Sequence, residues 1–143
     1  MSEKNPQRLD SAQLAAVFAT SPFMSTLNLE VLNIDYDKTE LSVRMPLRPS
    51  FERRVGTKQF HGGVIASLID VTGDFAIGMM LGGGVPTINL RIDYLKPAVG
   101  DALTATARVR RAGKTVAVID IDVMDEKGSV VALGRGTYYP QTG

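Results

Sequence analysis

The chain has 143 residues, of which 44% are hydrophobic and 22% charged; this composition is typical of a globular protein and excludes a disordered chain. Sixteen Lys and Arg against fifteen Asp and Glu give a net charge of +1, which argues against nucleic acid as the main partner. The absence of Cys excludes thiol catalysis, disulfides and thiolate metal sites, and a single His excludes a multi-histidine metal site within one chain.

The N-terminal segment is polar and lacks the apolar core of a signal sequence, so we expect a cytoplasmic location. Asp10 or Ser11 can cap a first helix over about residues 10–20, and Pro22 prevents its continuation. Segments that alternate or are apolar, bounded by turn residues, predict six strands at 29–36, 40–47, 87–97, 102–112, 115–123 and 129–140.

Between the second and third predicted strands lie a long polar loop, residues 48–60, and an apolar stretch over about residues 62–81. Its apolar positions are too dense for a one-sided surface helix, which predicts a helix buried nearly all round. Two acidic residues, Asp70 and Asp74, interrupt it and argue against a membrane span. Glycines at 82–84 end it.

This order of elements predicts one α+β domain over residues 1–143, an antiparallel six-stranded sheet wrapped round one long central helix. A single sheet cannot cover all sides of an apolar helix. We therefore expect a second copy of the chain to cover the remaining side.

Four segments carry a resemblance to a known family: "HGGVIASLID", "PTINLRIDYLKPA", "ARVRRAGKTVAVIDIDV" and "GRGTY". Together they resemble the hotdog-fold acyl-CoA thioesterases of the phenylacetate-pathway (PaaI-like) branch. The match runs from about Phe60 to Tyr138, and more loosely from Leu27. The resemblance implies hydrolysis of acyl-CoA to a free acid and CoA, in homodimers that often pair into tetramers. We expect no cofactor and no metal.

The glycines at the start of the central helix suit an oxyanion site. The first N–H groups of a helix have no partner within it and lie at the positive end of its dipole. Glycine lets a thioester approach the backbone closely, although the same residues also permit a tight turn. With the resemblance, the N–H of Gly62, or else that of Gly63, is the expected oxyanion donor.

Asp70 is the expected general base or nucleophile, by the resemblance and because a buried carboxylate is costly without a role or a partner. Asp74 lies one turn further on the same face and is the second candidate acid, or else an interface partner of an Arg. Thr87 falls where similar proteins carry a hydroxyl that holds water beside the acid; an ordinary strand threonine is the alternative. His61 is expected to orient the loop or line the pocket.

The spacing of the two main candidates indicates a composite site. Gly62 and Asp70 are eight positions apart, which is about 12 Å along a helix. A reacting carbonyl must lie about 3 Å from its oxyanion donor and also near its nucleophile. If both residues act on one substrate, they must come from different helices. Two antiparallel helices related by a two-fold axis can place Gly62 of one beside Asp70 of the other.

Many family members carry an Asn a few residues before HGG, whereas this chain has "RRVGTKQFHGG", where Gln59 is the available substitute. The CoA phosphates need cations, and a patch is expected from Arg53, Arg54, Lys58, Arg111, Lys114 and Arg135. Apolar residues expected to line the acyl pocket, unless they belong to the core, are Phe60, Phe75, Met79 and Met80.

Two alternative functions fit the same fold, because fold does not fix function. One is an acyl-CoA-binding protein without activity. The other is a hotdog enoyl-CoA hydratase or dehydratase, whose chemistry pairs a His with a separate helix acid, and no second motif of that kind is present.

Overall fold

The computed structural model describes residues 8–142. Within them the chain forms two α-helices, α1 (Ser11–Thr20) and α2 (Gly62–Leu81), and two short 3₁₀ helices, η1 (Met24–Leu27) and η2 (Pro49–Phe51). The strands are β1 (Glu30–Asp35), β2 (Glu40–Pro46), β3 (Thr87–Tyr94), β4 (Ala102–Ala112), β5 (Ala117–Met124) and β6 (Val130–Tyr138). Both predicted helices and all six predicted strands are present.

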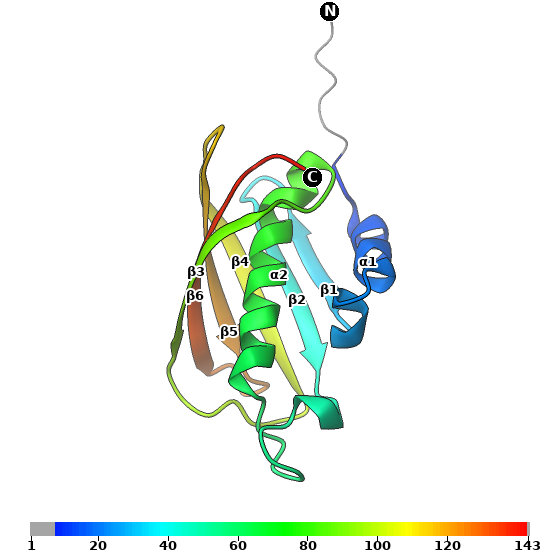
Figure 1. Cartoon of the computed structure of the whole chain (residues 1–143), viewed down its shortest axis with the longest axis vertical. Helices are drawn as coiled ribbons and strands as arrows, with labels where there is room; N and C mark the ends of the chain where they lie inside the picture. The colour runs from blue at the N-terminus through cyan, green and yellow to red at the C-terminus, as the bar shows by residue number, and fades with distance from the viewer. Residues whose placement is uncertain (1–7, 143) are drawn as a thin grey trace, which may run out of the picture.

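All six strands join one antiparallel sheet in the order β1-β2-β4-β5-β6-β3. The long helix α2 lies across one face of this sheet, and α1 lies beside the β1 edge (Figure 1). The other edge is β3, which within the described residues pairs with β6 alone. The predicted antiparallel sheet round one central helix is therefore confirmed.

The core lies between α2 and the sheet. Buried side chains of α2, such as Leu68 and Met79, share a cluster with buried strand residues such as Val43 and Ile121. Alternate residues of β2, β4 and β5 supply the sheet side of this cluster, as expected for strands with one covered face. The α1 helix joins the same core through Phe18, whose ring packs edge-on against Phe75 at 5.2 Å between centroids.

The central helix is not buried all round within one chain, so that prediction needs a correction. Gly63 is exposed, and Ser67, Asp70 and Asp74 are half-buried. Their spacing of three and four residues places them on one side of the helix, the side turned away from the sheet. The helix is long and apolar enough to cross a membrane, but 61% of its most apolar window is buried inside the fold, as for a core helix.

The polar segment 48–60 is more ordered than a long loop. It contains η2 and a bridge between Glu52 and Phe60. Phe51 and Phe60 are both buried, and the backbone N–H of His61 donates to the carbonyl of Phe51 at 2.8 Å. This segment therefore fixes the point at which α2 begins.

Candidate active site

The first turn of α2 contains one backbone N–H for which no acceptor is recorded within residues 8–142. His61 is the N-cap residue, and its Nδ1 accepts a hydrogen bond from the Gly63 N–H at 2.9 Å. The N–H groups of Val64 and Ile65 both donate to the His61 carbonyl. Among residues 8–142 no acceptor is recorded for the Gly62 N–H. This group lies at the positive end of the helix dipole and can bind a developing negative charge.

Tyr94 defines one wall beside this donor. Its hydroxyl donates to the Gly62 carbonyl at 2.8 Å, and a Cβ on Gly62 would lie 3.5 Å from its ring. Next to them is a depression of about 320 Å³, lined by Arg53, Gln59, Phe60, Gly62, Ile65, Tyr94, Lys96, Pro97 and Ala98. Sequence reasoning missed Tyr94 and Lys96, although both lie in the "YLKP" strand end that carried the resemblance.

Asp70 lies in the middle of α2 with its carboxylate held on one oxygen. Thr87, the first residue of β3, donates from Oγ1 to Asp70 Oδ1 at 2.8 Å. The Tyr138 hydroxyl lies 3.3 Å from the same oxygen and 3.1 Å from the Asp70 carbonyl. The structure thus brings together Asp70 and Thr87, and adds Tyr138, which sequence reasoning had not singled out.

Asp74 occupies the next turn of the same helix face. Its Oδ1 accepts a hydrogen bond from the Val85 N–H at 2.7 Å, in the segment that leads into β3. Burial raises the pKa of Asp74 to about 7, and the nearby charge of Asp70 acts in the same direction, whereas the Val85 bond opposes it. No ion pair of Asp74 is recorded within residues 8–142.

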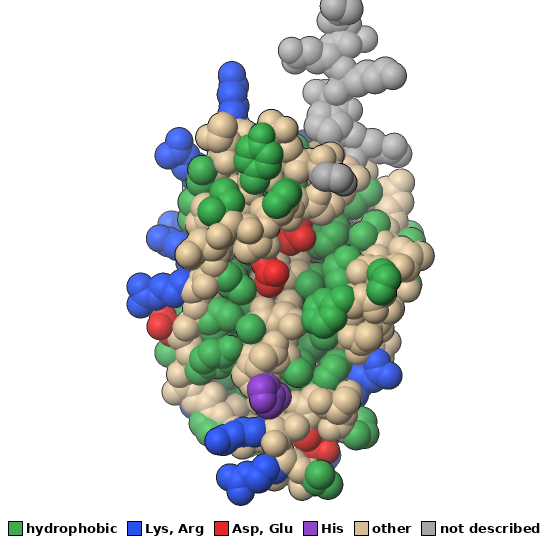
Figure 2. Space-filling model, in the orientation of Figure 1, with side chains coloured by type: hydrophobic (Ala, Val, Ile, Leu, Met, Phe, Trp, Pro, Cys, Tyr) green, Lys and Arg blue, Asp and Glu red, His purple; other side chains and the backbone are tan. Residues whose placement is uncertain are grey.

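The Gly62 N–H and the Asp70 carboxylate, the two groups suited to thioester chemistry, lie at different points along α2. Gly62 and Asp70 are separated by about 12 Å along α2, since a helix rises about 1.5 Å per residue. Figure 2 shows hydrophobic side chains on both sides of the central helix, with acidic side chains exposed between them. Within one chain, the Gly62 N–H and the Asp70 carboxylate therefore do not meet at one point.

The six cations expected to bind CoA do not form one patch within a chain. Arg53 borders the depression beside Gly62, and Arg54, the next residue in the sequence, is exposed. Lys58 pairs with Asp101 at 2.8 Å, and this contact raises the pKa of the Lys58 ammonium. Arg111 and Lys114 lie at the β4–β5 hairpin, at the end of the sheet opposite the start of α2 (Figure 1).

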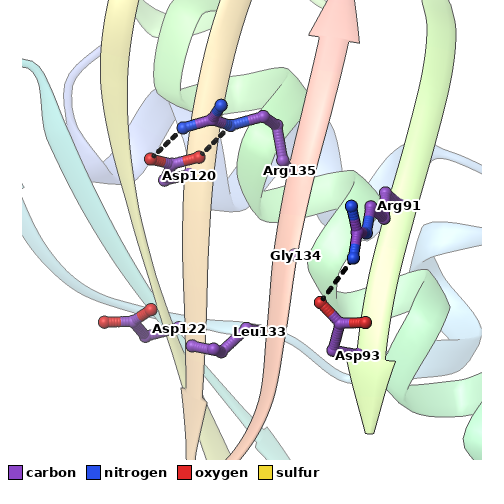
Figure 3. Close-up of a pocket in the computed structure, with 7 residues that line it drawn as sticks. All are labelled: Arg91, Asp93, Asp120, Asp122, Leu133, Gly134 and Arg135. Carbon is purple, nitrogen blue, oxygen red and sulfur yellow. Dashed lines mark hydrogen bonds and ion pairs between the residues drawn. The ribbon is translucent and has the colours of Figure 1, made fainter.

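Arg135 lies on the face of the sheet turned away from α2. It binds Asp120 through both Nε (2.7 Å) and Nη2 (2.9 Å), and this hydrogen-bonded pair lowers the pKa of Asp120 (Figure 3). The cavity at this place has about 420 Å³ and is lined by Arg91, Asp93, Asp120, Asp122, Leu133, Gly134 and Arg135. Arg135 is thus placed apart from Gly62 and Asp70, because alternate residues of a strand point to opposite faces.

Three of the four residues considered for an acyl pocket belong to the core instead. Phe60, Phe75 and Met79 are at most 3% exposed, and Met80 is half-buried. Phe60 alone also borders the depression beside Gly62. Within residues 8–142, no group of three His, Cys, Asp or Glu side chains is placed to hold a metal ion.

Comparison with known proteins yields one consistent family. Residues 59–132 match the family model described as the thioesterase superfamily. The medium/long-chain acyl-CoA thioesterase YigI of Escherichia coli is 31% identical over 132 residues, covering 82% of this chain and 84% of that protein. The acyl-coenzyme A thioesterase PaaI of the same organism is 39% identical over 82 residues, covering 57% of this chain and 58% of PaaI.

Two solved structures extend the similarity to nearly the whole chain. The zebrafish thioesterase superfamily member 2 has a TM-score of 0.80 at 26% identity and covers 93% of this chain and 99% of its own. The E. coli PaaI structure has a TM-score of 0.75 at 26% identity, covering 94% and 98%.

Proposed function

The chain belongs to the thioesterase superfamily and is a thioester hydrolase, and from this premise we propose that it hydrolyses acyl-CoA thioesters to a free acid and CoA. The acyl-CoA substrate is supported by the names of the relatives YigI and PaaI. The observation that carries the mechanism is the pair of half-sites on α2, a free backbone N–H at Gly62 and a hydroxyl-held carboxylate at Asp70.

We infer that two copies of the chain complete each site. With two α2 helices antiparallel, the Gly62 N–H of one subunit and the carboxylate of Asp70 of the partner subunit can reach the same thioester. The N–H stabilises the oxyanion that forms when the carbonyl carbon is attacked. Asp70 either takes a proton from the attacking water or attacks the carbon itself. The C–S bond then breaks, CoA leaves as the thiolate, and water supplies the acid's second oxygen.

The exposed surface of the single chain supports this pairing. The side of α2 that bears Asp70 is open, and among residues 8–142 no strand pairs with the outer side of β3, which is an edge strand. Two large apolar side chains of β3, Ile88 and Tyr94, are 57% and 52% exposed. A second copy would cover these groups and remove apolar surface from water. Further pairing of such dimers remains an expectation from the family resemblance.

The depression beside Gly62 is the candidate position for the thioester end of CoA. Arg53 and Lys96 border it and place positive charge where it can attract an anionic substrate such as CoA, and Gln59 stands near the place where many family members carry an Asn. His61 supports this region from the helix cap, because its ring nitrogen occupies the Gly63 N–H and leaves the Gly62 N–H as donor.

A thiol-release assay on a panel of aromatic, short and long acyl-CoAs tests the activity and finds the preferred acyl group. D70N should lose nearly all turnover while it still binds substrate. Incubation with an enoyl-CoA, with hydration measured separately from CoA release, tests the hydratase alternative. If D70N keeps wild-type turnover, the assignment of the base or nucleophile is wrong.

Mixing two inactive variants tests the composite site. D70N lacks the carboxylate, and G62P lacks the backbone N–H. If the site spans two subunits, a heterodimer of these chains has one intact site of two, so refolding an equal mixture restores about one quarter of wild-type activity. If both groups act within one chain, the mixture stays inactive and the two-subunit arrangement is refuted.

A further inference from the structure

Tyr138 is a buried tyrosine whose hydroxyl reaches the acid of the proposed site. It is the last residue of β6, and its side chain is 0% exposed. The hydroxyl lies 3.1 Å from the Asp70 carbonyl oxygen and 3.3 Å from Asp70 Oδ1. A tyrosine has one O–H donor, so these two oxygens share it.

Two glycines make the space that this hydroxyl occupies. A Cβ on Gly73, in the middle of α2, would collide with the Tyr138 hydroxyl, and a Cβ on Gly136 would collide with the hydroxyl and the ring. Glycine inside a helix costs about 1 kcal/mol relative to alanine. The contact explains why α2 carries a glycine at this buried position, three residues after Asp70.

As a result, the two oxygens of the Asp70 carboxylate differ in their hydrogen-bond partners. Oδ1 has hydroxyl groups on two sides, Thr87 Oγ1 at 2.8 Å and Tyr138 at 3.3 Å. Among residues 8–142 no donor to Oδ2 is recorded. A carboxylate oxygen with two donors is held in place, and the oxygen without donors is free to take a proton or to attack a carbon.

We propose that Tyr138 is a positioning residue, which together with Thr87 anchors Oδ1 of Asp70 and leaves Oδ2 as the reacting oxygen. This inference rests on the proposed function, in which Asp70 is the base or nucleophile. It assigns a role to the tyrosine of the "GRGTY" segment and names the atom that performs the chemistry.

The surroundings keep Tyr138 a donor at neutral pH. Burial raises the pKa of its phenol, and the negative charges of Asp70 and Asp74 raise it further. These two carboxylates, both on α2, are the titratable groups recorded as acting on it. The phenol therefore stays protonated and able to donate at neutral pH.

The test compares Y138F with Y36F. Tyr36 also donates a hydrogen bond to a backbone carbonyl, that of Leu9 at 2.6 Å, but its bond does not involve Asp70, so Y36F controls for the loss of a tyrosine hydroxyl. Y138F should lower kcat roughly ten-fold with little change in KM, because the carboxylate is bound but poorly oriented.

Y36F should keep the wild-type kcat and KM. A second variant, G73A, keeps the phenol but displaces its hydroxyl from Asp70, and should reproduce the kcat loss of Y138F if it folds. A Y138F enzyme with wild-type kcat and KM overturns the inference while D70N remains inactive. If D70N itself is active, the proposed function fails first, so the two failures are distinguishable.

Discussion

The imidazole of His61 accepts, through Nδ1, the N–H of the residue two positions later, Gly63, at 2.9 Å. This bond caps α2 and at the same time removes one of its free donors. The sequence analysis placed Gly62 before Gly63 as the expected oxyanion donor, and the structure gives the two N–H groups different surroundings. The N–H of Gly63 is used by the fold, whereas the N–H of Gly62 has no recorded acceptor within residues 8–142.

Replacing Gly62 by proline should remove the proposed oxyanion donor with little effect on the fold. Proline is well tolerated at the first position of a helix, and His61 has the extended backbone, with ψ of 141°, that a residue before proline prefers. We expect kcat to fall about 100- to 1,000-fold in G62P. G62A is the matched control, because it keeps the N–H and its Cβ makes an ordinary 3.5 Å contact with Tyr94. Equal activity of G62P and G62A would contradict the assignment.

Removal of the cap should cost stability. H61A loses the acceptor for the Gly63 N–H, and loss of an N-cap side chain costs about 1 kcal/mol. H61N should recover most of this loss, because Asn is a favoured N-cap residue. The free energies of unfolding from urea titrations measure both changes. If H61A and H61N are equally destabilised, the ring is important for a reason other than the cap.

Substitutions of Arg53 and Arg135 should differ in their effect on the KM for acyl-CoA. Arg53 borders the depression beside Gly62, so R53A should raise KM for acyl-CoA about three- to ten-fold and leave kcat unchanged. Arg135 is bound to Asp120 on the other face of the sheet, so R135A should leave KM unchanged. The free energy of unfolding of R135A should change little, since an exposed ion pair contributes little. Steady-state kinetics on both variants decide whether Arg135 belongs to the substrate site.

The periodicity of the sequence was enough to predict the helices and strands, but not which basic side chains lie near one another. Each strand and both helices follow from local alternation, apolar density and glycine or proline boundaries, and these patterns act within a few residues. Arg53 lies beside the depression, whereas Arg111 and Lys114 lie far from it. This difference depends on the direction in which β4 runs after the segment that connects it to β3. Strand alternation does place Arg135 opposite Gly134 and Gly136, but the sequence alone does not say which face lies against α2.

The contact between Tyr138 and Asp70 shows the same limit at the site. The two residues are 68 positions apart, and their meeting depends on the register of β6 against its neighbours and on the rotation of α2 above it. The two glycines that admit the phenol were a usable signal, since Gly73 lies in the interior of a helix, where glycine is disfavoured. Asp70 and Thr87 could be anticipated because a family resemblance, rather than a physical pattern, pointed to them.

A glycine near the end of α2 should prove necessary for the fold. A Cβ on Gly78 would lie 2.5 Å from the backbone oxygen of Gly83, and backbone cannot move aside as a side chain can. G78A should therefore destabilise the protein by about 1–3 kcal/mol although alanine favours helices. G83A is the matched control, because its Cβ would meet only the Thr142 methyl group at 3.4 Å. Thermal unfolding should show a lower Tm for G78A than for G83A.

Asp74 should make stability depend on pH with a definite sign. Burial raises the pKa of its carboxyl from an ordinary value of 3.8 to about 7. Between these values the folded protein holds a proton that the unfolded chain has released, so stability falls as pH rises through this window and stays lower above it.

The D74N variant cannot lose this proton and keeps an oxygen for the Val85 N–H. Relative to wild type, it should gain stability progressively from about pH 4 to pH 7, reaching roughly 1–3 kcal/mol at neutral pH. Urea unfolding of both proteins at a series of pH values measures the difference. A difference that does not change with pH would mean that Asp74 is charged in the folded protein throughout this range, and that its bond to Val85 outweighs its burial.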